Sequence, residues 1–144
     1  MSQDGLGGLL PPADEAGLYL VPVKDVGPLS RAAVALRIRC VHVDLRDCLT
    51  KADFLDRFSA ALGLPGRIGR NWDAFADALG DLRDPGAPGL VLLLSNSERM
   101  RTGSGDEFQT AMEVLESAST EWAARGGALW VFVALPPGEY DGAG

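Results

Sequence analysis

Two continuous apolar runs in the second half of the chain constrain the fold most. "LVLLLSN" covers residues 90–96 and "ALWVFVAL" covers residues 128–135, and neither run alternates with polar residues. Strands with this composition are typical of parallel sheets that are covered on both faces. A long amphipathic segment at 106–126 lies between them and ends at two glycines, which predicts a helix connecting the two buried strands.

The first half of the chain continues this alternation of strands and helices. "GLYLVPV" at 17–23 reads as a short strand, and Pro22 marks it as an edge or an end. "LSRAAVALRIR" at 29–39 is compatible with a helix capped by Ser30, and "CVHVDL" at 40–45 reads as a strand. The order of elements predicts an α/β fold, with a small, mostly parallel sheet of three or four strands packed with helices.

Two further helices follow in the middle of the chain. "TKADFLDRFSAALGL" at 50–64 is amphipathic, with Thr50 as its cap and Asp53 completing a capping box. A second helix begins after Asn71, a strong capping residue, and Gly80 is expected to end it. We expect a turn or loop at 84–89 and a polar connection in "SERMRTGSGD".

The length of 144 residues predicts one domain. We place it at 17–135, between a flexible N-terminal tail at 1–16 and a flexible C-terminal tail at 136–144, both rich in Gly, Pro and acidic residues. The net charge of −7 predicts repulsion from nucleic acid and from anionic membranes, and attraction to a basic protein.

The sequence lacks the features that would indicate a secreted protein or a membrane protein. The start of the chain lacks the basic and apolar regions of a signal peptide, and no run of apolar residues is long enough to span a membrane. We therefore expect a cytoplasmic protein. Its two cysteines, Cys40 and Cys48, form no disulfide framework and are expected to be reduced and partly buried.

The stretch "GRIGRNWDAFADALGDL" at 66–82 carries an unusual charge pattern. It places Asp73, Asp77 and Asp81 four residues apart, and like charges at this spacing cost a helix about 0.2–0.5 kcal/mol per pair. If Gly80 ends the helix, Asp81 lies just beyond it. Two interpretations remain open from the residues alone: a solvated helix face, or a surface that meets a cationic partner.

An enzyme is the weaker interpretation of the same residues. The single histidine, His42, lies inside a predicted strand, and no cluster of His and Cys suggests a metal site. "GRIGRN" lacks the preceding strand and the lysine of a phosphate-binding loop. Asp73 and Asp77 could act as an acid–base pair, but an exposed helix face offers no burial to raise a carboxylate pKa. We expect no catalytic residue, cofactor or metal.

The segment from Gly69 to Leu79, "GRNWDAFADAL", closely resembles the central motif of the barstar family, intracellular protein inhibitors of secreted microbial ribonucleases. The matching features are a helix that ends in Leu-Pro, then glycine, asparagine and two aspartates at fixed spacing, then a buried strand, a long helix and a last strand. The resemblance covers about 40–135. It implies a barstar-like fold, with residues 1–39 as an N-terminal extension.

The resemblance also implies a site. In the family, this acidic helix and the preceding loop occlude the ribonuclease active site. The aspartate matching Asp77 takes the place of a substrate phosphate, and the one matching Asp73 is a second ionic contact. By the same resemblance, the remaining partner-binding residues are the following: Asn71, Trp72, Gly69, Arg67, Ile68, Ala76, Gly80 and Glu121, with Glu116 as the alternative to Glu121.

The resemblance favours an inhibitor of a secreted guanyl-specific ribonuclease of the barnase-like class, with no nucleic acid or membrane as partner. Two departures bear on the choice of target. Arg67 and Ile68 stand where the type member of the family has aromatic residues, and Ala76 stands where it has tryptophan. The alternative is a binding or regulatory protein of the same fold that recognises another basic partner.

Overall fold

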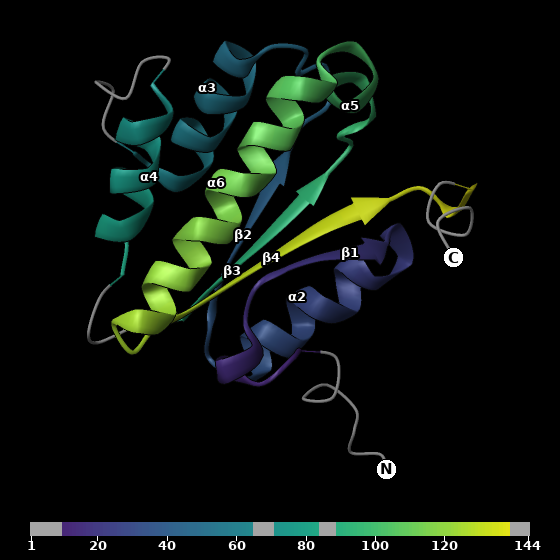
Figure 1. The fold of residues 1–144 in the computed structure, drawn as a ribbon. Helices are drawn as coiled ribbons and strands as arrows, with labels where there is room; N and C mark the ends of the chain where they lie inside the picture. The colour runs from purple at the N-terminus through teal and green to yellow at the C-terminus, as the bar shows by residue number, and fades with distance from the viewer. Residues whose placement is uncertain (1–9, 65–70, 84–88, 139–144) are drawn as a thin grey trace.

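A computed structural model describes residues 10–64, 71–83 and 89–138, and its centre is a four-stranded parallel sheet. Every neighbouring pair of strands is parallel, which confirms the predicted α/β class. The order across the sheet is β1 (Leu18–Pro22), β4 (Ala128–Leu135), β3 (Gly89–Ser95) and β2 (Arg39–Asp44), so the two apolar runs form the central strands (Figure 1).

Helices cover both faces of this sheet. One face carries α3 (Lys51–Leu62), α4 (Trp72–Asp81) and α6 (Gly105–Ala124), and the other carries α2 (Val26–Ala35), as Figure 1 shows. A short helix, α5 (Glu98–Gly103), precedes α6, and two 3-10 turns flank β1: η2 (Ala13–Glu15) and η3 (Val23–Asp25).

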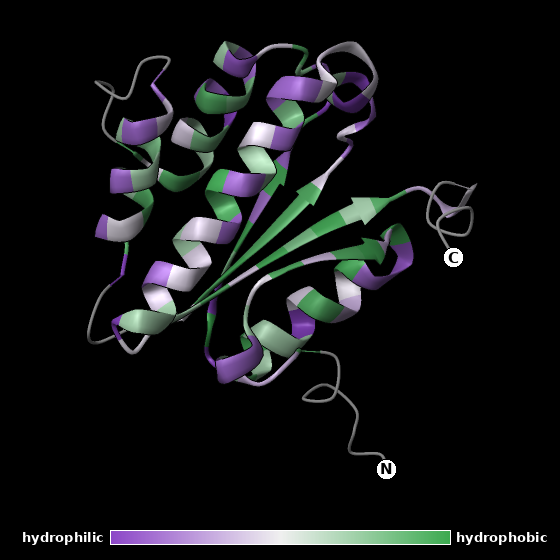
Figure 2. Ribbon diagram, in the orientation of Figure 1, coloured by the Kyte–Doolittle hydropathy of each residue, from purple (hydrophilic) through white to green (hydrophobic). Residues whose placement is uncertain are grey.

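Successive residues of the central strands supply two separate cores. Leu92 and Leu94 of β3 pack with α3, α4 and α6, whereas Val91 and Leu93 pack with α2. This division follows from the two-residue period of a strand, whose side chains point alternately to the two faces. Figure 2 shows hydrophobic residues along nearly the whole length of β3 and β4. This composition suits strands that are buried on both faces.

The predicted capping residues of α3 are confirmed. The Thr50 hydroxyl accepts from the backbone N–H of Asp53, and the Asp53 carboxylate accepts from the backbone N–H of Thr50. At the other end, Gly63 has a left-handed backbone with φ of 67°. Glycine adopts this conformation without a steric clash, because it has no Cβ atom, and it therefore ends the helix at low cost.

Three expectations about helices need correction. The helix expected at 29–39 instead spans Val26–Ala35. Pro28 is tolerated in its first turn, because the backbone N–H that proline lacks would have no partner within the helix at that position. The supposed polar connection contains α5, whose only buried residue, Met100, gives little periodicity to detect. Helix α4 continues through Gly80 to Asp81.

Residues 10–16 differ from the expected flexible tail. Leu10 is only 6% exposed and packs in the core on the α2 side, and the Trp130 indole Nε1–H donates to the Pro11 carbonyl at 3.0 Å. The predicted strand at 17–23 is present as β1, which pairs with β4. Of the two expected tails, residues 1–9 and 139–144 lie outside the described residues.

Candidate functional site

Helix α4 begins with a well-formed cap. The Asn71 side-chain oxygen accepts from the backbone N–H groups of Asp73, at 2.8 Å, and Ala74, at 3.2 Å. Two of the four N–H groups that a helix leaves unpaired at its start are thereby satisfied. The predicted role of Asn71 as a capping residue is confirmed, and it fixes where α4 begins.

The inner face of α4 is held by packing and by one buried hydrogen bond. Phe75, Ala78 and Leu79 are buried in the core shared with α3 and α6. The Trp122 indole N–H of α6 donates at 3.0 Å to the Leu79 carbonyl, which also accepts the backbone N–H of Leu82 at 3.2 Å. Helix α4 is therefore fixed against α6 at its C-terminal end.

The outer face of α4 carries three exposed carboxylates. Because the helix continues to residue 81, Asp73, Asp77 and Asp81 all lie on it at four-residue steps, about 6 Å apart along the axis. Within the part of the chain that the structure describes, their side chains form no hydrogen bond or ion pair. They add to one another's negative potential and are open to an approaching cation.

Trp72 lies between the core and the surface. Its ring packs in a tilted arrangement against Phe54, 5.8 Å away between centroids, and is also in contact with Phe75. The Lys51 ammonium lies 5.8 Å from the Trp72 ring centre, within the range of a cation–π contact. Lys51, Asn71, Trp72 and Asp73 line an open hollow of about 380 Å³.

Lys51 is a member of this surface that sequence reasoning missed. It is the first residue of α3, twenty-one positions before Trp72, and nothing in the spacing of residues links the two. Its backbone N–H donates to the Glu107 side chain of α6 at 2.7 Å, so the start of α3 is tied to α6. Only the packing of α3 against α4 brings Lys51 to the tryptophan.

Near the end of α4, a cation from α6 approaches the helix. A Cβ atom built on Gly80 would lie 3.6 Å from Nη1 of Arg125. Nη2 of the same guanidinium lies 4.0 Å from Glu121, in an exposed pair that contributes little to stability. Glu121 therefore lies one helical turn from a residue that borders α4, while the alternative, Glu116, is exposed more than one turn earlier in α6.

The remaining candidates are placed as follows. Ala76 is half-buried on α4, and Gly80 lies within the helix rather than after it. Arg67, Ile68 and Gly69 lie outside the described residues. The structure thus brings Asp73, Asp77, Asn71 and Trp72 onto one helix and places Glu121 on the helix packed beside it.

The histidine and the two cysteines lie outside helix α4. His42 is exposed on the edge strand β2, where its Nε2 lies 3.4 Å from the Ser30 hydroxyl. Both cysteines are free, Cys48 buried and Cys40 half-buried, and burial raises the pKa of both thiols. No three His, Cys, Asp or Glu side chains gather as a metal site in the described ranges, and none of the helices there could cross a membrane.

A comparison with protein families gives a match. The family model described as Barstar (barnase inhibitor) matches residues 38–134, which include β2, β3, the helices α3 to α6, and β4 up to its last residue but one. No curated protein matches the chain significantly. The match begins just after α2, so β1 and α2 form an N-terminal addition to the matched region.

Proposed function

This chain belongs to the barstar family, and from that premise we propose that it inhibits a secreted ribonuclease by covering the active site with helix α4. The target is a guanyl-specific enzyme of the barnase-like class. A ribonuclease must hold phosphate groups, so its active site presents clustered cations. The exposed carboxylates of α4 supply the opposite charge without any catalytic step on the inhibitor's side.

Asp77 is the central contact in this proposal. It lies in the middle of the acidic face, one turn from Asp73 and one turn from Asp81, with no competing partner in the described part of the chain. A carboxylate in that position can take the place of a substrate phosphate among arginine and lysine side chains. Asp73 forms the second ionic contact, nearer the start of the helix.

The single observation that carries the proposal is the combination of a fixed helix with unpaired charges. Asn71 fixes the start of α4, and the Trp122 hydrogen bond fixes its end. Little conformational freedom is therefore lost when the helix binds, and no ion pair within the described part of the chain must break. The repulsion among the aspartates in the free protein is relieved when a basic partner arrives, and the same charges accelerate association.

The rest of the proposed contact surface surrounds these carboxylates. It comprises Asn71, Trp72, Ala76 and Gly80 on α4 and at its cap, Glu121 on α6, and Arg67, Ile68 and Gly69 in the preceding segment. The inhibitor is proposed to act in the cytoplasm, where it protects the producing cell before export of the enzyme or a neighbouring cell after delivery.

Inhibition assays test this proposal directly. RNA cleavage by a panel of small guanyl-specific ribonucleases is measured with and without the protein at equimolar concentration. We expect stoichiometric inhibition of at least one enzyme, weakened by salt. Asp77→Ala should raise the inhibition constant at least about thirtyfold, because loss of one partner of an enclosed charge pair costs about 2–5 kcal/mol.

Asp56→Ala is the matched control, since Asp56 is an exposed helical aspartate on α3 rather than on α4. Both variants lose one negative charge. If only Asp77→Ala weakens inhibition, the cause is therefore the position of Asp77 and not the change in net charge. Equal inhibition by wild type and Asp77→Ala would contradict the assignment of the site.

The second candidate is recognition of another basic protein by the same surface. Arg125, which borders Gly80, and Ala76, where the type member has tryptophan, change the charge and the shape of the contact surface. Failure to inhibit any enzyme of the panel, together with Asp77-dependent capture of a basic protein that does not cleave RNA, would favour this alternative.

A further inference from the structure

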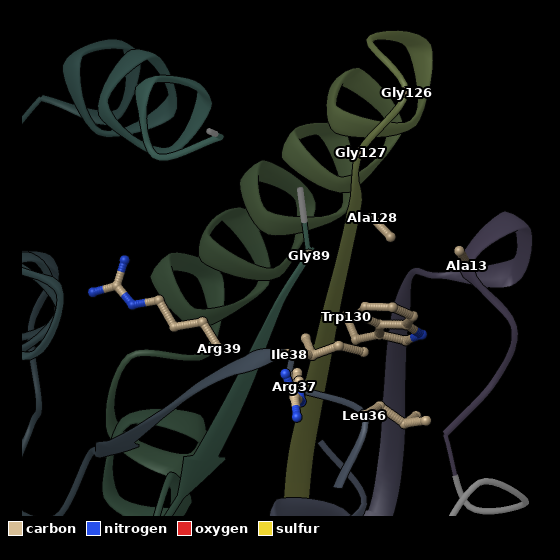
Figure 3. A pocket seen from close by; sticks show the side chains of 10 residues that line it. All are labelled: Ala13, Leu36, Arg37, Ile38, Arg39, Gly89, Gly126, Gly127, Ala128 and Trp130. Carbon is tan, nitrogen blue, oxygen red and sulfur yellow. The ribbon is translucent and has the colours of Figure 1, made fainter. Parts of the chain in front are cut away.

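A cavity of about 350 Å³ lies at the end of the sheet where β2, β3 and β4 begin (Figure 3). Its main wall residue, Trp130, belongs to the core on the α2 side, whereas α4 packs on the other face. The cavity is therefore separate from the acidic surface, and its volume falls within the range of about 300–1,000 Å³ that is usual for small-molecule sites.

The walls of this cavity are largely apolar. Ile38 and the Trp130 indole face it, and Leu36 at its rim is 50% exposed. The hydrogen bond from Trp130 to Pro11 fixes the plane of the indole. Gly89 leaves room beside it, since a Cβ there would lie 3.3 Å from Ile38 and 3.5 Å from Trp130.

Arg37 gives the cavity a cation at considerable conformational cost. Its φ is 61°, and it occupies the left-handed position that ends α2: its N–H bonds to the Val34 carbonyl and the next N–H to that of Ala33. Glycine is the usual residue in this motif. Asp47 and Asn96, the other non-glycine residues with positive φ in the described ranges, are types that tolerate it well.

The charge of Arg37 is available for a ligand. The side chain is exposed, and within the described residues its guanidinium has no hydrogen bond or ion pair. Figure 3 shows it beside Ile38 at the cavity, while Arg39 extends from the next strand in another direction. Arg39 likewise has no hydrogen bond or ion pair within the described residues, although the protein has a net charge of −7 and many carboxylates.

We propose that this cavity binds a small organic acid with an apolar body. The apolar part lies against Trp130 and Ile38, and the guanidinium of Arg37 forms a charge-assisted hydrogen bond with the carboxylate. Arg39 adds positive potential at the opening. The presence of arginine where glycine would be less strained is explained if the side chain has a binding role.

Fluorine NMR of the full chain labelled with 5-fluorotryptophan tests the proposal. The three tryptophan signals are assigned with Trp→Phe variants, and 4-phenylbutyrate is titrated as the probe. We expect a saturable shift of the Trp130 signal at millimolar probe, with the Trp72 signal unchanged. The uncharged analogue 4-phenylbutyramide should bind at least about tenfold more weakly, because it lacks the charge. No saturable shift, or equal affinity for acid and amide, would overturn the proposal.

Variants at position 37 separate binding from folding. Arg37→Lys should retain most of the affinity, and Arg37→Gln should lose about tenfold or more, while Arg31→Gln on the exposed part of α2 is the matched control and should bind as wild type. Arg37→Gly relieves the backbone strain, so it should resist urea at least as well as wild type and yet bind poorly. Wild-type affinity in Arg37→Gln or Arg37→Gly would refute the role of the guanidinium.

Discussion

Asn71 combines a folding role with a place in the proposed contact surface. Replacement by alanine leaves the N–H groups of Asp73 and Ala74 without their acceptor and should lower the free energy of unfolding by about 0.5–2 kcal/mol. Urea unfolding followed by circular dichroism measures this loss. Asn71→Ser, which can still cap the helix, should retain most of the stability; if serine and alanine prove equally damaging, capping is not the main role.

Asp53 makes the stability of α3 dependent on pH. Its carboxylate accepts from the backbone N–H groups of Leu49, at 3.0 Å, and Thr50, at 3.2 Å, and these hydrogen bonds lower the pKa of the carboxyl in the folded state. A lowered folded pKa contributes stability above the unfolded value of about 3.9, and that contribution is lost as pH falls through the folded pKa.

The corresponding test compares wild type with Asp53→Asn across the acid range. The variant should be less stable near neutral pH, and the difference should vanish once the wild-type carboxyl is protonated. Unfolding by urea at a series of pH values between neutrality and strong acid measures the difference. Asp44, whose pKa is lowered mainly by the Asn96 side chain, titrates in both proteins and cancels in the comparison. A difference that persists in strong acid would contradict the assignment.

At the scale of elements, the position of α4 depends on Trp122. Trp122→Phe removes the indole donor to the Leu79 carbonyl, which then keeps only its hydrogen bond from the Leu82 N–H, and this loss should cost about 0.5–1.5 kcal/mol. Relative to wild type, the variant should show faster hydrogen exchange at the amides of α4. The amides of α2, which packs on the opposite face, should change less. Unchanged protection of α4 in the variant would show that packing alone holds the helix.

The same contact bears on inhibition. If α4 is loosened, its carboxylates no longer have fixed positions, and binding must first order the helix. We expect Trp122→Phe to inhibit less well than wild type although no proposed contact residue has changed. Weaker inhibition by this variant would show that the hydrogen bond from Trp122 to Leu79 influences binding at the outer face of α4.

At the scale of the whole molecule, residues 10–16 contribute to the core. Leu10 is buried beside Trp130, so Leu10→Ala should lower the free energy of unfolding by about 1.5–3 kcal/mol, the contribution of a buried leucine side chain. Leu20→Ala, at a position that is 52% exposed, is the control and should change stability by less than about 0.5 kcal/mol. Thermal or urea unfolding compares the two, and equal effects would contradict the proposed packing of this segment.

The sequence by itself determined the class of fold and most of its elements. Continuous apolar runs specified the central strands β3 and β4, and the Thr50 and Asn71 caps specified where α3 and α4 begin. The signals for these features are local, because an apolar run that predicts burial, or a cap with the residues that it bonds, lies within a few positions of the sequence. The four-residue spacing of the aspartates on α4 could be recognised in the sequence for the same reason.

Tertiary structure decided what local rules leave open. Gly80 remains in α4 where Leu79 bonds to Trp122, Lys51 meets Trp72, and residues 10–16 pack on Trp130, all through contacts between residues far apart in the sequence. No periodicity encodes such contacts, because they depend on how strands order themselves in the sheet and how helices pack across it. The sequence therefore identified the acidic helix, whereas packing fixed its length, its orientation and the side chains around it.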